Sequence, residues 1–191
     1  MFYYLIRNSF AYFFKVFYLL NFDGLENLPL QGPYIICANH TSWFDPPLVG
    51  SLPLKERKIY FMAKEELFKI FPLGFILKKL EAFPVKRNIA DRKAIRRALQ
   101  VLSAGGILGL FPEGTRMRTG ELGKPHHGAA LIALKSKKPV LPIAIKWPPR
   151  IFQPVKINIG PLIYFEEGGK IKGEVLEKIS LQIMAEIKKL L

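Results

Sequence analysis

The stretch "PYIICANHTSWFDPP", residues 33–47, decides how the chain is built. It begins with an unbroken apolar run, which is typical of a strand buried on both faces of a sheet. It then reaches Asp45-Pro46-Pro47, and aspartate and proline are favoured at the first positions of a helix. We therefore predict a buried strand over residues 33–39, a loop that carries His40, and a short helix capped by Asp45.

Apolar runs and helical patterns alternate along the rest of the chain. The further predicted strands are 58–63, 106–111 and 139–145, with one or two edge strands within 156–165. The predicted helices are 89–106, 128–138 and 174–191. Strands separated by helices are typical of an α/β domain. We predict a single α/β domain over residues 23–191, with a mainly parallel central sheet flanked by helices.

The first 22 residues are predicted to form one amphipathic helix. On a helical projection its apolar side chains gather on one side, namely Phe2, Leu5, Ile6, Phe10, Phe13, Phe17 and Leu20. Polar and basic residues lie opposite, with tyrosines nearby, which suits the headgroup level of a bilayer. We predict a membrane-interface helix over residues 1–22; the alternative is an ordinary helix packed on the domain. The segment falls short of the roughly 18–20 apolar residues of a membrane span.

The charge of the chain is strongly positive. Lys and Arg number 29 against 15 Asp and Glu, a formal net charge of +14. Such a surface favours an anionic partner, which could be nucleic acid, an anionic membrane surface or a phosphorylated substrate. The sequence has no basic recognition helix and no aromatic strand of the kind that binds RNA, so we expect no nucleic-acid partner. The single cysteine, Cys37, lies in a predicted buried strand and is expected to be an inert core thiol.

The segment "ELFKIFPLGFILKKL", residues 66–80, has apolar residues on more than one face. Pro72 and Gly74 interrupt it, and Lys78 and Lys79 follow. Three interpretations stay open from periodicity alone: plain core, a hydrophobic flap beside the membrane helix, or one wall of a slot for an acyl chain.

Polar and charged residues follow several of the predicted strands. His40 and Asp45 follow the first, Lys64 follows 58–63, and Glu113 and Arg116 follow 106–111. Ligands of α/β folds bind at the carboxyl ends of strands. A bent loop would bring the Asp45 carboxylate to one ring nitrogen of His40 and leave the other nitrogen as a general base. The structural alternative is that Asp45 only caps its helix and His40 only satisfies a buried carbonyl.

Other catalytic patterns are missing from the sequence. It has no G-x-S-x-G nucleophile elbow, no P-loop and no G-x-G-x-x-G fingerprint. His126 and His127 are neighbours, without cysteines or acidic residues at ligand spacing, so no metal site is predicted.

These motifs resemble the 1-acylglycerol-3-phosphate acyltransferase family of glycerolipid acyltransferases over most of residues 30–150. "NHTSWFD" matches its H-x-x-x-x-D block, and "FPVKR", "FPEGTR" and "VLPI" match the three later blocks in order. The resemblance implies His40 as general base, Asp45 as its orienting partner and Arg87 as a phosphate ligand. It further implies acceptor binding by Glu113, Gly114, Thr115 and Arg116, and we add Lys64 from its place after a strand.

The activity implied by the resemblance is acyl transfer from a thioester to the free sn-2 hydroxyl of 1-acylglycerol-3-phosphate. No cofactor is expected, because acyl-CoA or acyl-carrier protein is the donor substrate. The expected location is the cytoplasmic face of a membrane, with a lipid acceptor and an anionic surface as partners. The alternatives are another lysophospholipid acceptor, or a basic membrane- or nucleic-acid-binding protein without catalysis.

Overall fold

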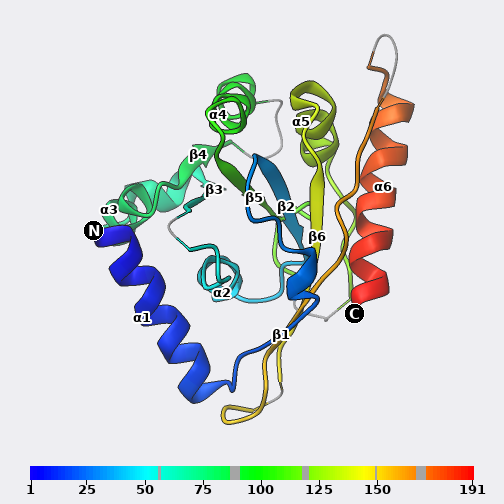
Figure 1. The fold of residues 1–191 in the computed structure, drawn as a ribbon. Coiled ribbons are helices and arrows are strands. Elements are labelled where there is room, and N and C mark those ends of the chain that lie inside the picture. Colours follow the sequence, from blue (N-terminus) through cyan, green and yellow to red (C-terminus); the bar gives the residue numbers. More distant parts are fainter. Residues whose placement is uncertain (56, 87–90, 118–120, 149, 167–170) are drawn as a thin grey trace.

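The computed structural model describes residues 1–191 apart from 56, 87–90, 118–120, 149 and 167–170 (Figure 1). Within them one seven-stranded sheet has the strand order β1-β7-β6-β2-β5-β3-β4. The strands are β1 (Asn21–Asp23), β2 (Tyr34–Ala38), β3 (Ile59–Lys64), β4 (Phe83–Val85), β5 (Ile107–Leu110), β6 (Val140–Lys146) and β7 (Lys156–Ile159). The α-helices are α1 (Phe2–Phe17), α2 (Asp45–Gly50), α3 (Leu73–Lys79), α4 (Arg92–Ser103), α5 (Gly128–Ser136) and α6 (Gly173–Leu190). Two 3₁₀ turns complete the described elements, η1 (Leu25–Asn27) and η2 (Glu65–Lys69).

The predicted α/β architecture is confirmed. Neighbouring strands pair in parallel except β6 and β7, which are antiparallel. The predicted edge segment 156–165 supplies β7 and an isolated bridge from Ile163 to Val140. Strands β1 and β4 were not predicted as strands, because each has only three residues and β4 contains Pro84. Both lie at the edges of the sheet, where proline is tolerated because it removes no shared ladder bond.

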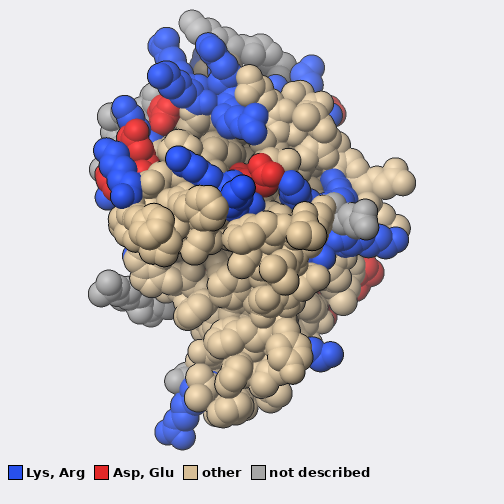
Figure 2. Space-filling view, turned by 90° about the vertical axis from the view of Figure 1, so that its left-hand side faces the viewer, with Lys and Arg blue, Asp and Glu red and all other residues tan. Residues whose placement is uncertain are grey.

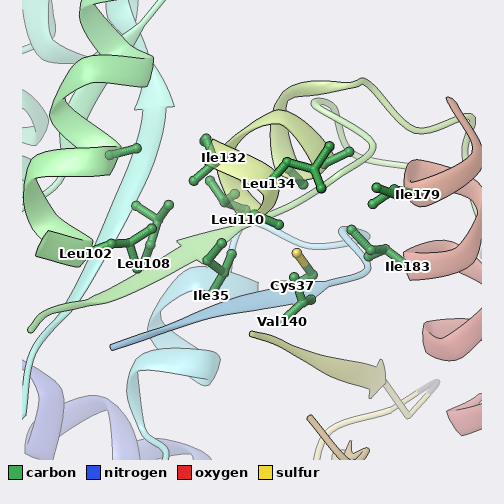
Figure 3. Close-up of a cluster of buried hydrophobic side chains, with 14 of the residues drawn as sticks. Ile35, Cys37, Leu102, Leu108, Leu110, Ile132, Leu134, Val140, Ile179 and Ile183 are labelled. Atoms are coloured by element: carbon green, nitrogen blue, oxygen red, sulfur yellow. The ribbon is translucent and has the colours of Figure 1, made fainter. Parts of the chain in front are cut away.

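Side chains of the central strands alternate between two buried cores, one on each face of the sheet. Ile35 and Cys37 of β2 point into a core covered by α4, α5 and α6 (Figure 3). The neighbouring residues Tyr34, Ile36 and Ala38 point into the opposite core, which α1 and α2 cover. The Cys37 side chain is fully buried, so its predicted place in the core is confirmed, and burial raises the pKa of its thiol well above the usual range.

Helix α1 both packs on the domain and leaves an apolar side exposed. It ends at Phe17 rather than at residue 22, and residues 21–23 form the edge strand β1 instead. Phe14 is completely buried in the core shared with α2, and Phe10 and Phe13 pack partly against the same core. Phe2, Leu5, Tyr12, Val16 and Phe17 remain exposed. Among the described residues, no helix combines the length and the apolar character needed to cross a bilayer.

The contribution of α1 to stability can be measured with two phenylalanines of the same helix. We expect Phe14→Ala to lower the free energy of unfolding by about 3 kcal/mol, because it leaves a cavity in a packed core. Phe17→Ala is the matched control, since that ring is 39% exposed. Urea unfolding in the absence of lipid measures both; equal small effects would contradict the packing of α1 onto the domain.

Candidate active site

The carboxyl ends of β2, β5 and β6 meet at one edge of the sheet, because the three strands are parallel and β2 lies between the other two. Asn39, directly after β2, fastens this edge. Its side-chain amide donates to the Ile145 carbonyl at 3.0 Å, and its side-chain oxygen accepts from the Ile145 N–H at 2.7 Å. These two hydrogen bonds therefore fix the position at which the backbone leaves the sheet and continues to His40.

The loop after β2 brings His40 and Asp45 together, as predicted. The distance from His40 Nδ1 to Asp45 Oδ2 is 2.8 Å, and the Asp45 side chain is fully buried. The same oxygen accepts hydrogen bonds from the backbone N–H groups of Thr41 and Ser42, both at 2.7 Å. Because a carboxylate only accepts hydrogen bonds, His40 donates to it from Nδ1, which leaves Nε2 with its lone pair.

The predicted capping role of Asp45 is wrong. Asp45 is the first residue of α2, Phe44 occupies the cap position, and no side chain caps this helix. The carboxylate turns back toward the loop because the loop presents two backbone N–H groups and the imidazole there. The helix start retains the expected proline, which needs no hydrogen-bond acceptor.

Trp147 completes the shell around Asp45, and the sequence analysis missed it. It follows β6, and its indole N–H donates to Asp45 Oδ1 at 2.6 Å. Both carboxylate oxygens are therefore hydrogen bonded. A tryptophan just after a predicted central strand was the available signal, since a buried indole N–H usually needs an acceptor.

Residues 111–117, which follow β5, hold His40 on three sides. Glu113 Oε1 accepts from the His40 backbone N–H at 3.1 Å, and the Met117 N–H donates to the His40 carbonyl at 2.8 Å. The Phe111 ring stacks on the imidazole, with ring centroids 4.2 Å apart and planes 23° apart. The loop that contains the FPEGTR motif thus positions His40 of the NHTSWFD motif.

Glu113 is buried and already hydrogen bonded within the protein, unlike a side chain that is exposed to bind substrate. It is only 2% exposed, and its second oxygen accepts from the Gly123 N–H at 3.2 Å. Burial raises the pKa of this carboxyl above its usual range. These contacts support a positioning role for Glu113, while the implied contact to an acceptor hydroxyl stays a prediction.

Gly114, Thr115 and Arg116 form the outer part of the same loop. Gly114 has φ +64°, and a Cβ at this position would come within 2.5 Å of the His126 ring, so both backbone conformation and space require glycine. Thr115 is exposed. The Arg116 guanidinium lies 3.4 Å from the centroid of the exposed Trp43 ring, a cation–π contact that extends toward the loop of His40.

The remaining predicted cations are more distant or lie outside the description. Lys64 ends β3 and forms an ion pair with Glu66 at 3.3 Å on the surface. No hydrogen bond or ion pair within the described residues joins it to His40, Asp45 or Glu113. Arg87 lies outside the described residues. Binding of a phosphate by Lys64 or Arg87 stays a prediction.

The geometry matches the outcome of comparison with known proteins. Residues 19–146 match the family model named Acyltransferase. The chain belongs to this family. The match includes His40, Asp45 and the 111–117 loop, and ends at the last residue of β6.

Individual members of the family are similar to this chain over part of their length. A 1-acyl-sn-glycerol-3-phosphate acyltransferase of Bacillus subtilis (strain 168) is 39% identical over 125 residues, which cover 64% of this chain and 60% of that protein. A lyso-ornithine lipid O-acyltransferase of Pseudomonas aeruginosa is 34% identical over 118 residues, which cover 60% of this chain and 43% of that protein. The chain therefore spans less than two thirds of the length of both relatives.

A solved structure shares the whole fold. The crystal structure of the 1-acyl-sn-glycerophosphate (LPA) acyltransferase, PlsC, from Thermotoga maritima superposes with a TM-score of 0.70 and 27% sequence identity. The superposition covers 99% of this chain and 76% of that chain.

The role of Glu113 can be separated from substrate binding by two variants. We expect Glu113→Ala to lower kcat for acyl transfer more than it changes the KM for the acceptor, because His40 loses the contact that fixes its backbone. Two N–H groups would also lose their partner, at about 1–3 kcal/mol each. Glu113→Gln should keep more activity, since its side-chain oxygen can still accept from His40. Steady-state kinetics measures both, and a large rise in KM with unchanged kcat would show acceptor binding instead.

Proposed function

We propose that this acyltransferase transfers a fatty acyl group from an acyl thioester to the free sn-2 hydroxyl of 1-acylglycerol-3-phosphate, giving phosphatidate. The observation that carries the proposal is the His40–Asp45 pair at the carboxyl edge of the sheet, with Nδ1 held at 2.8 Å by a buried carboxylate. No hydrogen bond within the described residues engages Nε2. This arrangement leaves one ring nitrogen available to a substrate hydroxyl.

The chemistry follows from that nitrogen. Nε2 accepts the proton of the acceptor hydroxyl while the hydroxyl oxygen forms a bond to the thioester carbonyl carbon. The carbon–sulfur bond then breaks, and the proton on His40 is available to the departing thiolate. Asp45 stabilises the imidazolium that exists between these steps. Positioned general-base catalysis contributes on the order of 10²–10⁴-fold, so holding both substrates in place must supply much of the rest.

The acceptor's phosphate requires cations near His40. Arg116 is the described candidate, because its guanidinium lies over Trp43 within the His40–Asp45 loop. We propose that Arg116 and Arg87 bind the phosphate, with Gly114 and Thr115 beside the glycerol and Lys64 at the outer end of the site. The charge of +14 favours a phosphorylated acceptor and an anionic surface.

The acceptor is a membrane lipid, so we propose that the enzyme works at a membrane surface, on the cytoplasmic side. The exposed apolar side chains of α1 support this, because aromatic and aliphatic groups next to basic residues suit the interface of a bilayer. The donor is acyl-CoA or acyl-carrier protein. The similarity to a lyso-ornithine lipid acyltransferase makes a different lysolipid acceptor the second candidate.

The reaction class can be tested with purified protein in detergent or vesicles. We expect wild type to form phosphatidate from lysophosphatidate and an acyl thioester, and we expect His40→Ala to lose at least about 100-fold in rate, because the base is removed. His127→Ala is the matched control, since His127 lies at the start of α5 and makes no described contact with His40.

The choice of acceptor decides between the candidates. Transfer to lysophosphatidate and none to lyso-ornithine lipid would support the proposal; the reverse would assign the second candidate. No transfer to either acceptor with either donor, by folded protein, would contradict catalysis and favour a non-catalytic binder.

A further inference from the structure

We propose that residues 69–79 form a second lipid-contacting element, separate from α1, which inserts into an anionic bilayer. The inference rests on the membrane-borne acceptor of the proposed function. The segment comprises the end of η2, the connecting residues 70–72 and helix α3. The sequence left three interpretations of this segment open: plain core, a hydrophobic flap, or one wall of a slot for an acyl chain.

Three large apolar side chains of this segment are exposed. Phe71 is 90% exposed, and Ile70 and Phe75 are 52% and 55% exposed. The first of the three interpretations, plain core, is therefore wrong for these side chains. Three large apolar groups that are adjacent along one short segment favour contact with an apolar phase.

The charges around these side chains indicate which apolar phase this is. Residues 67–80 contain Lys69, Lys78 and Lys79 and no acidic residue. The Lys79 ammonium lies 5.5 Å from the centroid of the Phe75 ring, so a cation and an aromatic ring stand at the same level. Lysines beside exposed aromatic rings match a bilayer interface with anionic headgroups. A second copy of the chain would bring the same positive charge and be repelled.

The backbone holds the segment firmly in this outward position. The Gly74 N–H donates to the Ile70 carbonyl at 2.7 Å, which closes the turn that carries Phe71. A Cβ at Gly74 would lie 2.1 Å from the Phe68 carbonyl oxygen, so the helix start sits directly against the preceding turn. The aromatic rings are thus presented by a packed turn.

The segment lies on the same side of the molecule as α1. Figure 1 shows α1 and α3 on the left-hand side of the sheet, away from α6. Figure 2, which faces that side, shows a broad uncharged surface with Lys and Arg, and a few Asp and Glu among them, mainly along its upper border. A flat bilayer could contact both elements at once, and the basic border would meet the headgroups.

The test is vesicle binding by Phe71→Ser/Phe75→Ser. Leu181→Ser is the matched control, because Leu181 is 53% exposed and lies on α6, on the opposite face of the sheet. With vesicles of phosphatidylcholine and phosphatidylglycerol, we expect the double variant to bind about tenfold more weakly than wild type and the control to bind like wild type. Vesicles of phosphatidylcholine alone should bind wild type weakly.

Three outcomes would overturn this proposal. They are unchanged binding by the double variant, equal loss in the control, or a wild-type dimer in the absence of lipid that the double variant dissociates. Transfer to a short-chain lysophosphatidate dispersed as monomers should be unchanged in the double variant. If the wild type transfers no acyl group at all, the proposed function is wrong. The vesicle measurement still decides whether residues 69–79 contact the bilayer.

A different observation carries a second inference: we infer that Trp147 is a positioning residue that couples α1 to Asp45. Its indole N–H donates to Asp45 Oδ1 at 2.6 Å. The rings of Tyr18 and Phe14 pack edge-on against the indole, with centroids 5.3 and 6.0 Å away. One side chain therefore connects the end of α1 with the catalytic carboxylate.

The hydrogen bond from the indole fixes the rotation of the Asp45 carboxylate and draws on its negative charge. With Oδ1 bonded to the indole, Oδ2 faces His40 Nδ1. Of the other charged groups in the described structure, Glu113 contacts the backbone N–H of His40, and Arg116 contacts the ring of Trp43 in the same loop as His40. Without the indole N–H, the Asp45 carboxylate keeps more of its negative charge. This charge stabilises the proton on the imidazole, so protonated His40 is favoured.

The test is Trp147→Phe, which keeps a ring for α1 and removes the donor, with Tyr12→Phe as control at an exposed aromatic residue of α1. We expect kcat to fall about tenfold with little change in acceptor KM, in line with a lost hydrogen bond to a charged group. The acid limb of kcat/KM should move to higher pH. A role in packing alone would lower stability and leave the acid limb in place, which would overturn the inference.

The inference can also be tested without turnover. The NMR titration midpoint of His40 should rise in Trp147→Phe and stay at the wild-type value in Tyr12→Phe. An unchanged midpoint in Trp147→Phe would contradict the inference even if the proposed reaction were absent.

Discussion

The site depends on one buried carboxylate, that of Asp45. A buried charge is costly unless hydrogen bonds replace its water, and here three parts of the loop and the end of β6 supply donors. The backbone N–H groups of Thr41 and Ser42 bend the loop around the carboxylate, which is why residues five apart in sequence can touch. The imidazole is the only member of this shell with a second nitrogen to offer a substrate. The hydrogen bonds to the Asp45 carboxylate thus determine the tautomer, the orientation and the proposed chemistry of His40.

The sheet makes this arrangement possible at long range. Parallel pairing of β2 with β5 and β6 brings the loops that follow them to one edge, although residues 40, 113 and 147 are far apart in sequence. Glu113 and Met117 then hold the backbone of His40, while Trp147 holds the carboxylate. The same indole packs against Tyr18 and Phe14, so the helix that we place at the membrane also supports the site. The proposed membrane helix and the candidate site are thus both in contact with one aromatic side chain, that of Trp147.

Local pattern was enough for the long elements and for the contact between His40 and Asp45. The buried strand 33–39, the amphipathic helices and the His40–Asp45 contact follow from side-chain character and spacing, and the structure contains them. The short strands β1 and β4 escaped because three residues have no detectable period and depend on neighbouring strands. Trp147 and the buried side of Glu113 escaped because their partners lie in other segments, and only the folded sheet sets those distances. The cap role given to Asp45 failed because local propensity cannot show that the loop N–H groups, the imidazole and the distant indole of Trp147 all donate to this carboxylate.

The measurement that tests the central claim most directly is the tautomer of the neutral His40 ring, from ¹⁵N NMR of the imidazole above its titration midpoint. With three histidines in the chain, His40 can be assigned by comparison with His126→Gln and His127→Gln variants. The account predicts a proton on Nδ1, hydrogen bonded to Asp45, and a bare Nε2 that changes shift when lysophosphatidate is added. A proton on Nε2 would contradict the account, because the ring could then neither donate to Asp45 nor accept the proton of a substrate hydroxyl.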